Sequence, residues 1–112
     1  MFRVVYFLYR RSDLTHEEFV NHWWHTHVPL VRQFPGLIRY QIAPVTGSPD
    51  DVPPDVDGVA ELYYESREAF ERAQTSRQME IALRDTPNFT RLVTAVFVED
   101  RPVSLPEPLA AY

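Results

Sequence analysis

Three of the chain's four histidines, His22, His25 and His27, lie within a stretch of six residues. Imidazoles bind transition metals and exchange protons near neutral pH, so this cluster predicts either a metal site or acid/base chemistry. Each residue of an α-helix advances by about 100°, which places His27 about 140° from His22 and about 160° from His25. One helix cannot direct all three rings at one ion, so we expect no metal. We expect His22, His25 and Glu18 on an exposed polar face, and the fourth histidine, His16, in solvent.

His27 differs from its neighbours because it belongs to the apolar stripe of the same segment. The stripe residues recur at steps of 4, 4, 3 and 4 and comprise Phe19, Trp23, His27, Leu30 and Phe34. A buried imidazole needs a hydrogen-bond partner. Two interpretations follow: a core histidine bonded to a backbone carbonyl or to Glu61, or an acid/base group that faces a pocket.

Glu61 is the second candidate, since it stands in an apolar segment where an unpaired carboxylate is costly. It forms a structural ion pair with Arg3 or Arg39 in one interpretation. In the other, it orients His27 or acts as a base of raised pKa.

Three tyrosines allow a similar choice. Tyr6, Tyr40 and Tyr63 fit the core as amphipathic residues. A phenol close to His27 would also be able to hold an oxygen atom of a substrate.

The composition excludes several classes of protein. The 112 residues carry a net charge of -5, no cysteine and three glycines, and all eleven basic residues are arginine. The charge argues against a nucleic-acid partner, and the missing thiols and lysines exclude thiolate and Schiff-base chemistry. Three scattered glycines form no phosphate-binding loop. The chain shows neither a membrane-spanning apolar run nor a secretion signal, so a cytoplasmic protein is expected.

The apolar pattern positions the candidate residues on four strands and two helical stretches. Runs of aromatic and β-branched residues predict strands at 2–11, 37–45, 58–65 and 91–100. Thr15 and Glu18 fit a capping box that begins the first helix, and Pro29 predicts a kink because it cannot donate a hydrogen bond. A second helical stretch begins after Ser66, with an irregularity near Ser76.

This β-α-β-β-α-β order predicts an α+β, ferredoxin-like fold, in which a four-stranded antiparallel sheet carries two helices on one face. The first and last strands, expected side by side at the centre of the sheet, are apolar on both faces. Because the helices cover one face, we expect a second copy on the other, in a homodimer joined through the sheets. Residues 1–101 form the domain, 102–112 a proline-rich tail, and 46–57 a polar loop that is either a lid or a disordered tip.

Three motifs resemble the EthD family: F-x-x-H-W-x-x-x-H-x-P-L at 19–30, P-G-L-x-x-Y at 35–40 and D-G-V-A-E-L at 57–62. The family more usually carries Tyr where His22 stands and Arg where Trp24 stands. The resemblance implies a dimeric α/β barrel with a pocket between helices and sheet, and chemistry that often needs no metal or organic cofactor. Relatives are associated with ether degradation, with decarboxylation or dehydration of aromatic polyketides and with lactone isomerisation, and many are labelled oxidoreductases.

Carried over by motif, the histidine of H-x-P-L is His27 and the tyrosine of P-G-L-x-x-Y is Tyr40, which favours a pocket role for His27. We therefore expect a small cofactor-independent enzyme that acts on a hydrophobic aromatic, polyketide-like or lactone metabolite. His27 would be the general acid/base, Tyr40 a hydrogen-bond donor, and Glu61 an orienting group or second proton carrier. The expected pocket walls are Tyr6, Phe7, Trp23 and Leu30. The alternatives are a non-catalytic binding or accessory dimer for a partner oxidase, and a metal-dependent oxygenase.

Overall fold

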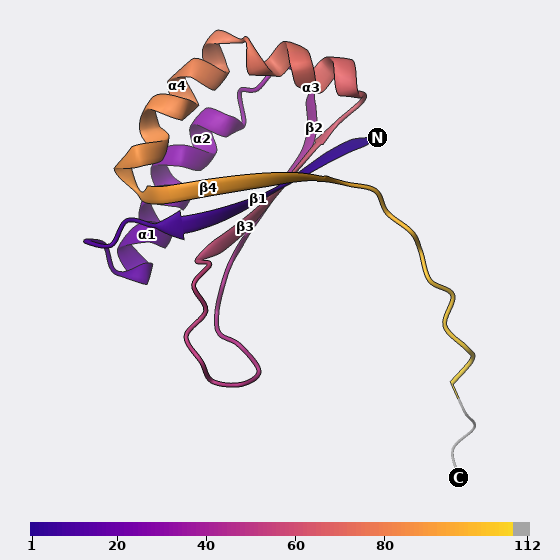
Figure 1. Ribbon diagram of the computed structural model, residues 1–112. Helices are drawn as coiled ribbons and strands as arrows, with labels where there is room; N and C mark the ends of the chain where they lie inside the picture. Colours follow the sequence, from indigo (N-terminus) through magenta and orange to yellow (C-terminus); the bar gives the residue numbers. More distant parts are fainter. Residues whose placement is uncertain (109–112) are drawn as a thin grey trace.

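The computed structural model describes residues 1–108, and its elements follow the predicted order (Figure 1). Residues 109–112, the end of the predicted tail, lie outside the described residues. The strands are β1 (Phe2–Arg10), β2 (Leu37–Pro44), β3 (Gly58–Tyr64) and β4 (Thr90–Val98). The helical elements are α1 (His16–His22), η1 (Trp23–His27), α2 (Val28–Val31), α3 (Arg67–Gln74), α4 (Arg77–Asp85) and η2 (Thr86–Asn88). No helix within residues 1–108 is long and apolar enough to span a bilayer.

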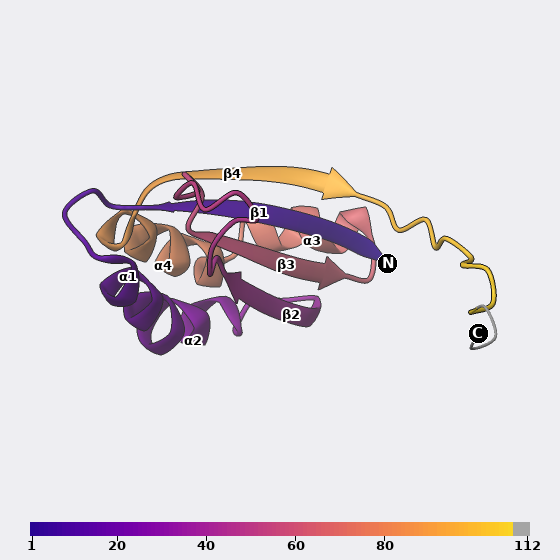
Figure 2. The same ribbon diagram turned by 90° about the horizontal axis from the view of Figure 1, so that it is seen from below.

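The strands form one antiparallel sheet in the order β2-β3-β1-β4, which Figure 2 shows from below. The helices cover one face of this sheet (Figure 1), so the predicted ferredoxin-like fold is confirmed. β1 and β4 are neighbours, as expected. However, β3 takes the second side of β1, so β4 lies at the edge of the sheet and not at its centre.

Alternate side chains of each strand face the helices or the opposite, outer side of the sheet. On β1, Val4 and Leu8 face the helices and belong to the core. The outer side of β4 exposes Leu92 and Val96, at 50% and 45% of their surface. The largest fully buried side chains of the core are Trp23, Tyr64, Phe19 and Phe89.

Serine and threonine hydroxyls begin three of the helices, and the first two of these caps, at Thr15 and Ser66, were predicted. Thr15 and Glu18 form a capping box, in which each side chain accepts a hydrogen bond from the backbone N–H of the other residue. Ser66 caps α3, and Ser76 caps α4 after the predicted interruption. These caps fix where each helix starts and therefore which side chains reach the sheet.

Between α1 and α2 the helix widens into one π-helical turn, η1. The N–H of Val28 bonds the carbonyl of Trp23, five residues earlier. Pro29 has no N–H to offer the carbonyl of His25, so a regular α-helical ladder is interrupted here. The predicted irregularity is therefore present, and it takes a form that is often found at functional sites.

The loop at residues 46–57 contains no helix or strand. Figure 1 shows that it projects on the side of the sheet opposite to the helices, so it does not cover the helical side as a lid would. Its end is anchored by Asp57, which accepts a hydrogen bond from the backbone N–H of Arg10 at 3.0 Å and lies 3.1 Å from Nδ1 of His16. His16 therefore contacts a carboxylate, which corrects the expectation that it faces only solvent.

Candidate functional site

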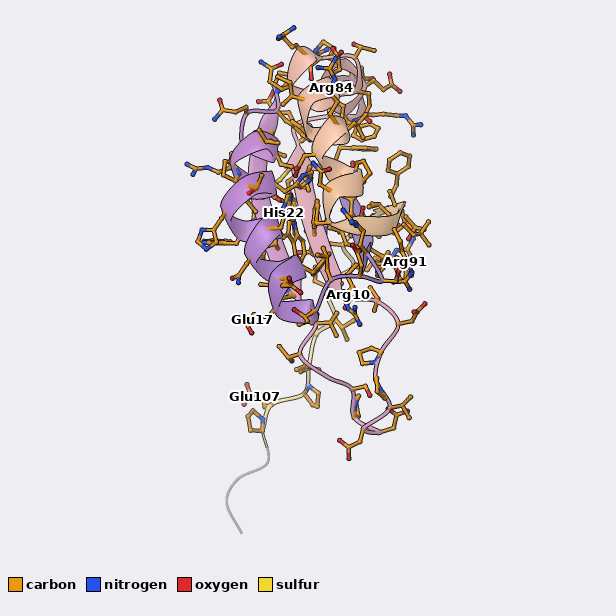
Figure 3. All side chains as sticks on the ribbon, turned by 90° about the vertical axis from the view of Figure 1, so that its left-hand side faces the viewer. Arg10, Glu17, His22, Arg84, Arg91 and Glu107 are labelled. Carbon is orange, nitrogen blue, oxygen red and sulfur yellow. The ribbon has the colours of Figure 1, made fainter. Side chains whose placement is uncertain are left out.

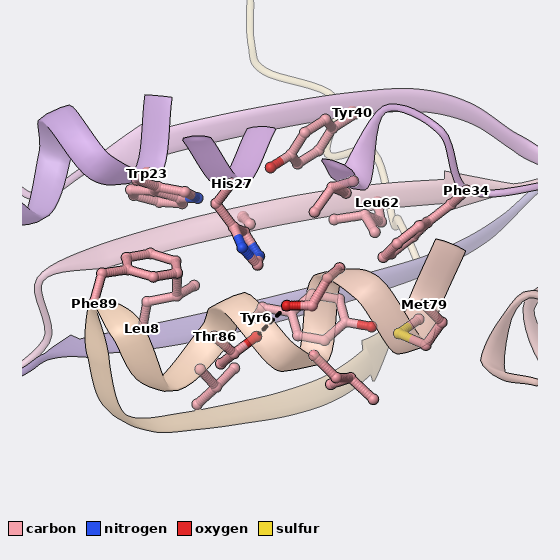
Figure 4. A pocket seen from close by; sticks show the side chains of 15 residues that line it. Tyr6, Leu8, Trp23, His27, Phe34, Tyr40, Leu62, Met79, Thr86 and Phe89 are labelled. Carbon is pink, nitrogen blue, oxygen red and sulfur yellow. Dashed lines mark hydrogen bonds between the residues drawn. The ribbon is translucent and has the colours of Figure 1, made fainter. Parts of the chain in front are cut away.

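A cavity of about 120 Å³ lies between the helices and the inner face of the sheet (Figure 4). An apolar cavity of about 150 Å³ holds one benzene molecule, so this cavity has room for about one ring. Most of its walls are apolar and come from both helical stretches and from all four strands. These apolar residues are Leu8, Val31, Phe34, Ala60, Leu62, Met79, Ala82, Leu83, Phe89 and Val93.

Five side chains with polar atoms complete the walls: Tyr6 from β1, Tyr40 from β2, Trp23 and His27 from η1, and Thr86 from η2. Figure 4 shows the Tyr40 hydroxyl directed toward the side of the cavity where Trp23 and His27 lie. The hydroxyl of Tyr6 points toward Met79 at the other end. The cavity is therefore a mostly apolar space, with Trp23, His27 and Tyr40 at one end and the Tyr6 hydroxyl at the other.

His27 is held in place by a carboxylate from α4. Its Nδ1 lies 2.8 Å from Oδ2 of Asp85, and the two side chains are only 11% and 9% exposed. An ionised carboxylate can only accept hydrogen bonds, so this contact assigns the N–H to Nδ1. In the neutral ring, Nε2 then carries the free lone pair, and Figure 4 shows the ring projecting into the cavity.

The electrostatic environment keeps Asp85 ionised and His27 neutral. Burial lowers the pKa of His27, an effect that the hydrogen bond and charge of Asp85 offset only in part. Burial alone would raise the pKa of Asp85, but hydrogen bonds from His27, His22 and Asn88 outweigh it and lower that pKa. At neutral pH the pair therefore offers a proton acceptor to the cavity.

The two tyrosines of the cavity remain protonated. Burial raises the pKa of Tyr40 far above neutrality, against a smaller opposing effect of the Trp23 side chain. Burial also raises the pKa of Tyr6. Both phenols can therefore donate a hydrogen bond to a ligand oxygen at physiological pH.

Acidification is expected to lower the free energy of unfolding in two steps. The pKa of His27 is below its ordinary 6.5, so the unfolded chain binds more protons and stability falls as the pH drops from 6.5 through the lowered value. The pKa of Asp85 is below its ordinary 3.8, so its contribution is lost only in stronger acid. Urea unfolding across a pH series should show the first step in the wild type and in His25→Gln. The step should be absent in His27→Gln, and its persistence there would assign it to another group.

The π-helical turn brings a second histidine to the same carboxylate. Nε2 of His22 lies 2.9 Å and 3.1 Å from the two oxygens of Asp85. His22 and His27 are five residues apart, a spacing that a π-helix, but not an α-helix, places on one face. The expectation that His22 lies on an exposed polar face is therefore wrong, because that prediction assumed a regular α-helix.

Of the seven side chains predicted for the site, four line the cavity: His27, Tyr40, Tyr6 and Trp23. Glu61 and Phe7 belong to the opposite face of the sheet, since Ala60, Leu62, Tyr6 and Leu8, their neighbours in sequence, line the cavity. Leu30 packs against the core but does not line the cavity. After the π-helical turn, Val31 lies in the cavity wall where Leu30 was expected.

Glu61 forms an ion pair with Arg3, the structural interpretation that the sequence had left open. Its side chain projects from β3 on the outer side of the sheet, so the sheet itself separates it from His27. The partner of His27 is Asp85 in place of Glu61.

Asp85 escaped prediction, although one signal was present. It is the last residue of α4, and a negative charge at a helix C-terminus is unfavourable next to the helix dipole. An acidic residue at such a position points to a specific partner. Asn88, one turn later, adds a further hydrogen bond to Asp85 at 3.2 Å.

In the part of the chain that the structure describes, no group of three or more histidine or acidic side chains has a geometry that could hold an ion. His25 is exposed, and His22 and His27 direct their nitrogens at Asp85.

Comparisons with known proteins give the chain its context. Residues 11–92 match the sequence model described as "EthD domain". An uncharacterised 11.0 kDa protein from the thcB-thcC intergenic region of Rhodococcus erythropolis is 35% identical over 86 residues, which are 76% of this chain and 82% of that protein. The crystal structure of an ethyl tert-butyl ether d (EthD) family protein from Bacillus halodurans has a TM-score of 0.77 at 25% identity, covering 90% of this chain and 100% of its own.

Two more distant structures share the fold. A dimeric ferredoxin-like protein of unknown function from Thermobifida fusca has a TM-score of 0.69 at 15% identity, with 87% of this chain and 88% of that chain covered. SnoaB, a cofactor-independent oxygenase from Streptomyces nogalater, has a TM-score of 0.61 at 19% identity, with 95% and 96% covered. The structural neighbours thus include dimers and oxygenases.

Proposed function

The chain belongs to the EthD family, and on this premise we propose that it is a small acid/base enzyme that moves protons on a hydrophobic ligand. The observation that carries the proposal is the buried pair of Asp85 and His27 at 2.8 Å. The carboxylate fixes one ring nitrogen as a donor, and the other is left to act on whatever occupies the cavity.

In the proposed step, Nε2 of His27 takes a proton from a carbon or hydroxyl group of the ligand. The electron pair left behind moves to an adjacent carbonyl oxygen, which gives an enolate, or stays on the oxygen as a phenolate. Tyr40 donates a hydrogen bond to that oxygen as it gains charge. Asp85 stabilises the imidazolium without taking its proton. Return of the proton to a different atom of the ligand completes an isomerisation.

The cavity defines the ligand by size and polarity. About 120 Å³ of largely apolar space suits a single aromatic or lactone ring. Tyr40 and His27 lie on one side of that space (Figure 4), so the ring should carry a carbonyl or hydroxyl oxygen at that end.

Exchange of ligand protons with D₂O tests this function without knowledge of the net reaction. A panel of single-ring ketones, lactones and phenols is incubated with the protein in D₂O, and loss of each carbon-bound proton signal is followed by ¹H NMR. The proposal expects saturable exchange for at least one compound, with a rate that falls as acid protonates His27. If compounds bind in the cavity but none exchanges faster than in buffer, the chain is a binding protein and the proposal is wrong.

The proposal includes a second copy of the chain on the outer side of the sheet. That side exposes Leu92, Val96 and Val98 of β4, the last at 37%, and exposed apolar faces of this kind mark interfaces. The loop at 46–57 and the described part of the tail project on the same side (Figure 1), so both would flank the second copy. A homodimer related by a twofold axis follows.

Replacing Val96 with glutamate is expected to give a monomer of 13.1 kDa where the wild type has twice that mass. The side chain lies on the outer side of β4, opposite Val5, and a carboxylate buried there without a partner costs several kcal/mol. Light scattering coupled to gel filtration measures the mass. Ile81→Glu is the matched control, since Ile81 is 37% exposed on α4; it should remain dimeric. A dimeric Val96→Glu would place the interface elsewhere.

A further inference from the structure

Two histidines contact the carboxylate of Asp85, although the contact with His27 alone is sufficient to orient that ring. The carboxylate accepts from Nδ1 of His27 at 2.8 Å, lies 2.9 Å from Nε2 of His22, and accepts from the side-chain amide of Asn88 at 3.2 Å. The His22 side chain is 27% exposed against 11% for His27. Figure 3 shows His22 on the helical side of the molecule, between the first helical stretch and α4. One histidine therefore reaches water, and the other reaches the cavity.

We propose that His22 controls the proton affinity of His27 through the carboxylate that both rings share. The consequence for turnover rests on the proposed function of His27, but the coupling between the two rings exists whether or not the chain is an enzyme. His22 acts on His27 through Asp85, so it is a positioning residue.

The coupling follows from the charges in the cluster. One carboxylate neutralises one imidazolium, so a second proton leaves the buried group with a net positive charge. The ring of Phe89 packs against both imidazoles, with centroids 4.9 Å from His22 and 4.8 Å from His27. An aromatic ring supplies no negative charge that would offset the second proton. Protonation of either histidine therefore disfavours protonation of the other.

The neighbouring charged groups are engaged elsewhere. On α1, the Glu18 side chain accepts from the backbone N–H of Thr15 at 2.9 Å. Before α1, Arg11 pairs with Asp13 and donates to the backbone carbonyl of Asn88. On α4, Arg84 and Glu80 pair with each other at 2.6 Å. Within residues 1–108, Asp85 is thus the one carboxylate in contact with either ring.

Burial disfavours the charged form of His27, so its Nε2 stays free for the ligand. A positive charge on His22 would lower the pKa of His27 further. A tyrosine at position 22 would carry no such charge, so the histidine of this chain makes the proton affinity of the site depend on pH.

NMR titration of the full chain with ¹³C- and ¹⁵N-labelled histidine tests the proposal in wild type and in His22→Gln. Glutamine keeps a side-chain N–H for Asp85 but cannot become charged. The expected result is a pKa of His27 higher by about 1 in His22→Gln, since the full charge of Asp85 then acts on one ring. If His22 merely holds the carboxylate in place, its loss leaves that pKa unchanged or lowers it, and the proposal is overturned.

Two further measurements keep the test decisive. His25→Gln changes an exposed histidine of the same segment that has no contact with Asp85 and should leave the pKa of His27 unchanged. The wild type alone should show a titration of His27 in two steps, as expected for one of two coupled groups. A single independent step would overturn the proposal even if His22→Gln failed to fold. A proton-exchange assay without activity would overturn the proposed function but not this coupling.

Discussion

Replacing His27 with glutamine is expected to lower the rate of ligand proton exchange by about 10²–10⁴-fold, the usual contribution of a positioned general base. Glutamine can still donate a hydrogen bond to Asp85 through its amide group, so the carboxylate keeps a partner. It cannot take up and return a proton near neutral pH. ¹H NMR in D₂O measures the rate with the best compound of the panel, at a pH where wild-type His27 is neutral.

Binding and rate must be separated in this experiment. The affinity of His27→Gln for the same compound, measured by ligand titration, is expected to stay within a few-fold, because most of the cavity wall is apolar. His25→Gln should exchange at the wild-type rate, since His25 is exposed and outside the cavity. Equal rates in wild type and His27→Gln would remove His27 from the mechanism.

The fold followed from local patterns because each pattern is set by short-range physics. The capping box at Thr15 and Glu18 and the caps at Ser66 and Ser76 depend on residues three positions apart, and all of them are present. The position of β4 depends instead on which strand takes the second side of β1. β3 takes that side although its outer face carries Glu61, and no local pattern along either strand records this pairing.

The candidate site was likewise predictable where it depends on local spacing, and not where it depends on contacts between distant residues. The apolar stripe placed Trp23 and His27 at the cavity, and this part depends on helical spacing. Side chains alternate between the two faces of a strand, so Glu61 faces away from the cavity that Ala60 and Leu62 line. This alternation would have excluded Glu61 from the predicted site. The contact of Asp85 with His27 does not follow from local spacing, because it joins residues 58 positions apart. The π-helical turn compounded the difficulty by changing the angle between His22 and His27.

Gly58 is the position where one added methyl group should harm both fold and site. A Cβ atom there would lie 2.6 Å from Cη2 of Trp23 and closer still to Cζ3. Trp23 is 1% exposed and packs against Phe19, so its ring can move only by repacking the core or by entering the cavity that it lines. The ring also forms the cavity wall beside His27 and Tyr40 (Figure 4), and any displacement changes the shape of the ligand site.

Gly58→Ala is therefore expected to lower the free energy of unfolding by roughly 3 kcal/mol, the upper range for overpacking of a core. Gly47→Ala is the matched control, because a Cβ at that position meets no atom within 4 Å; its effect should stay within about 0.5 kcal/mol. Urea unfolding followed by tryptophan fluorescence measures both. Equal stabilities would mean that the backbone at Gly58 shifts freely away from Trp23. A destabilised but folded Gly58→Ala should also bind the best compound of the panel more weakly, which would tie the strand start at β3 to the ligand site through a single aromatic ring.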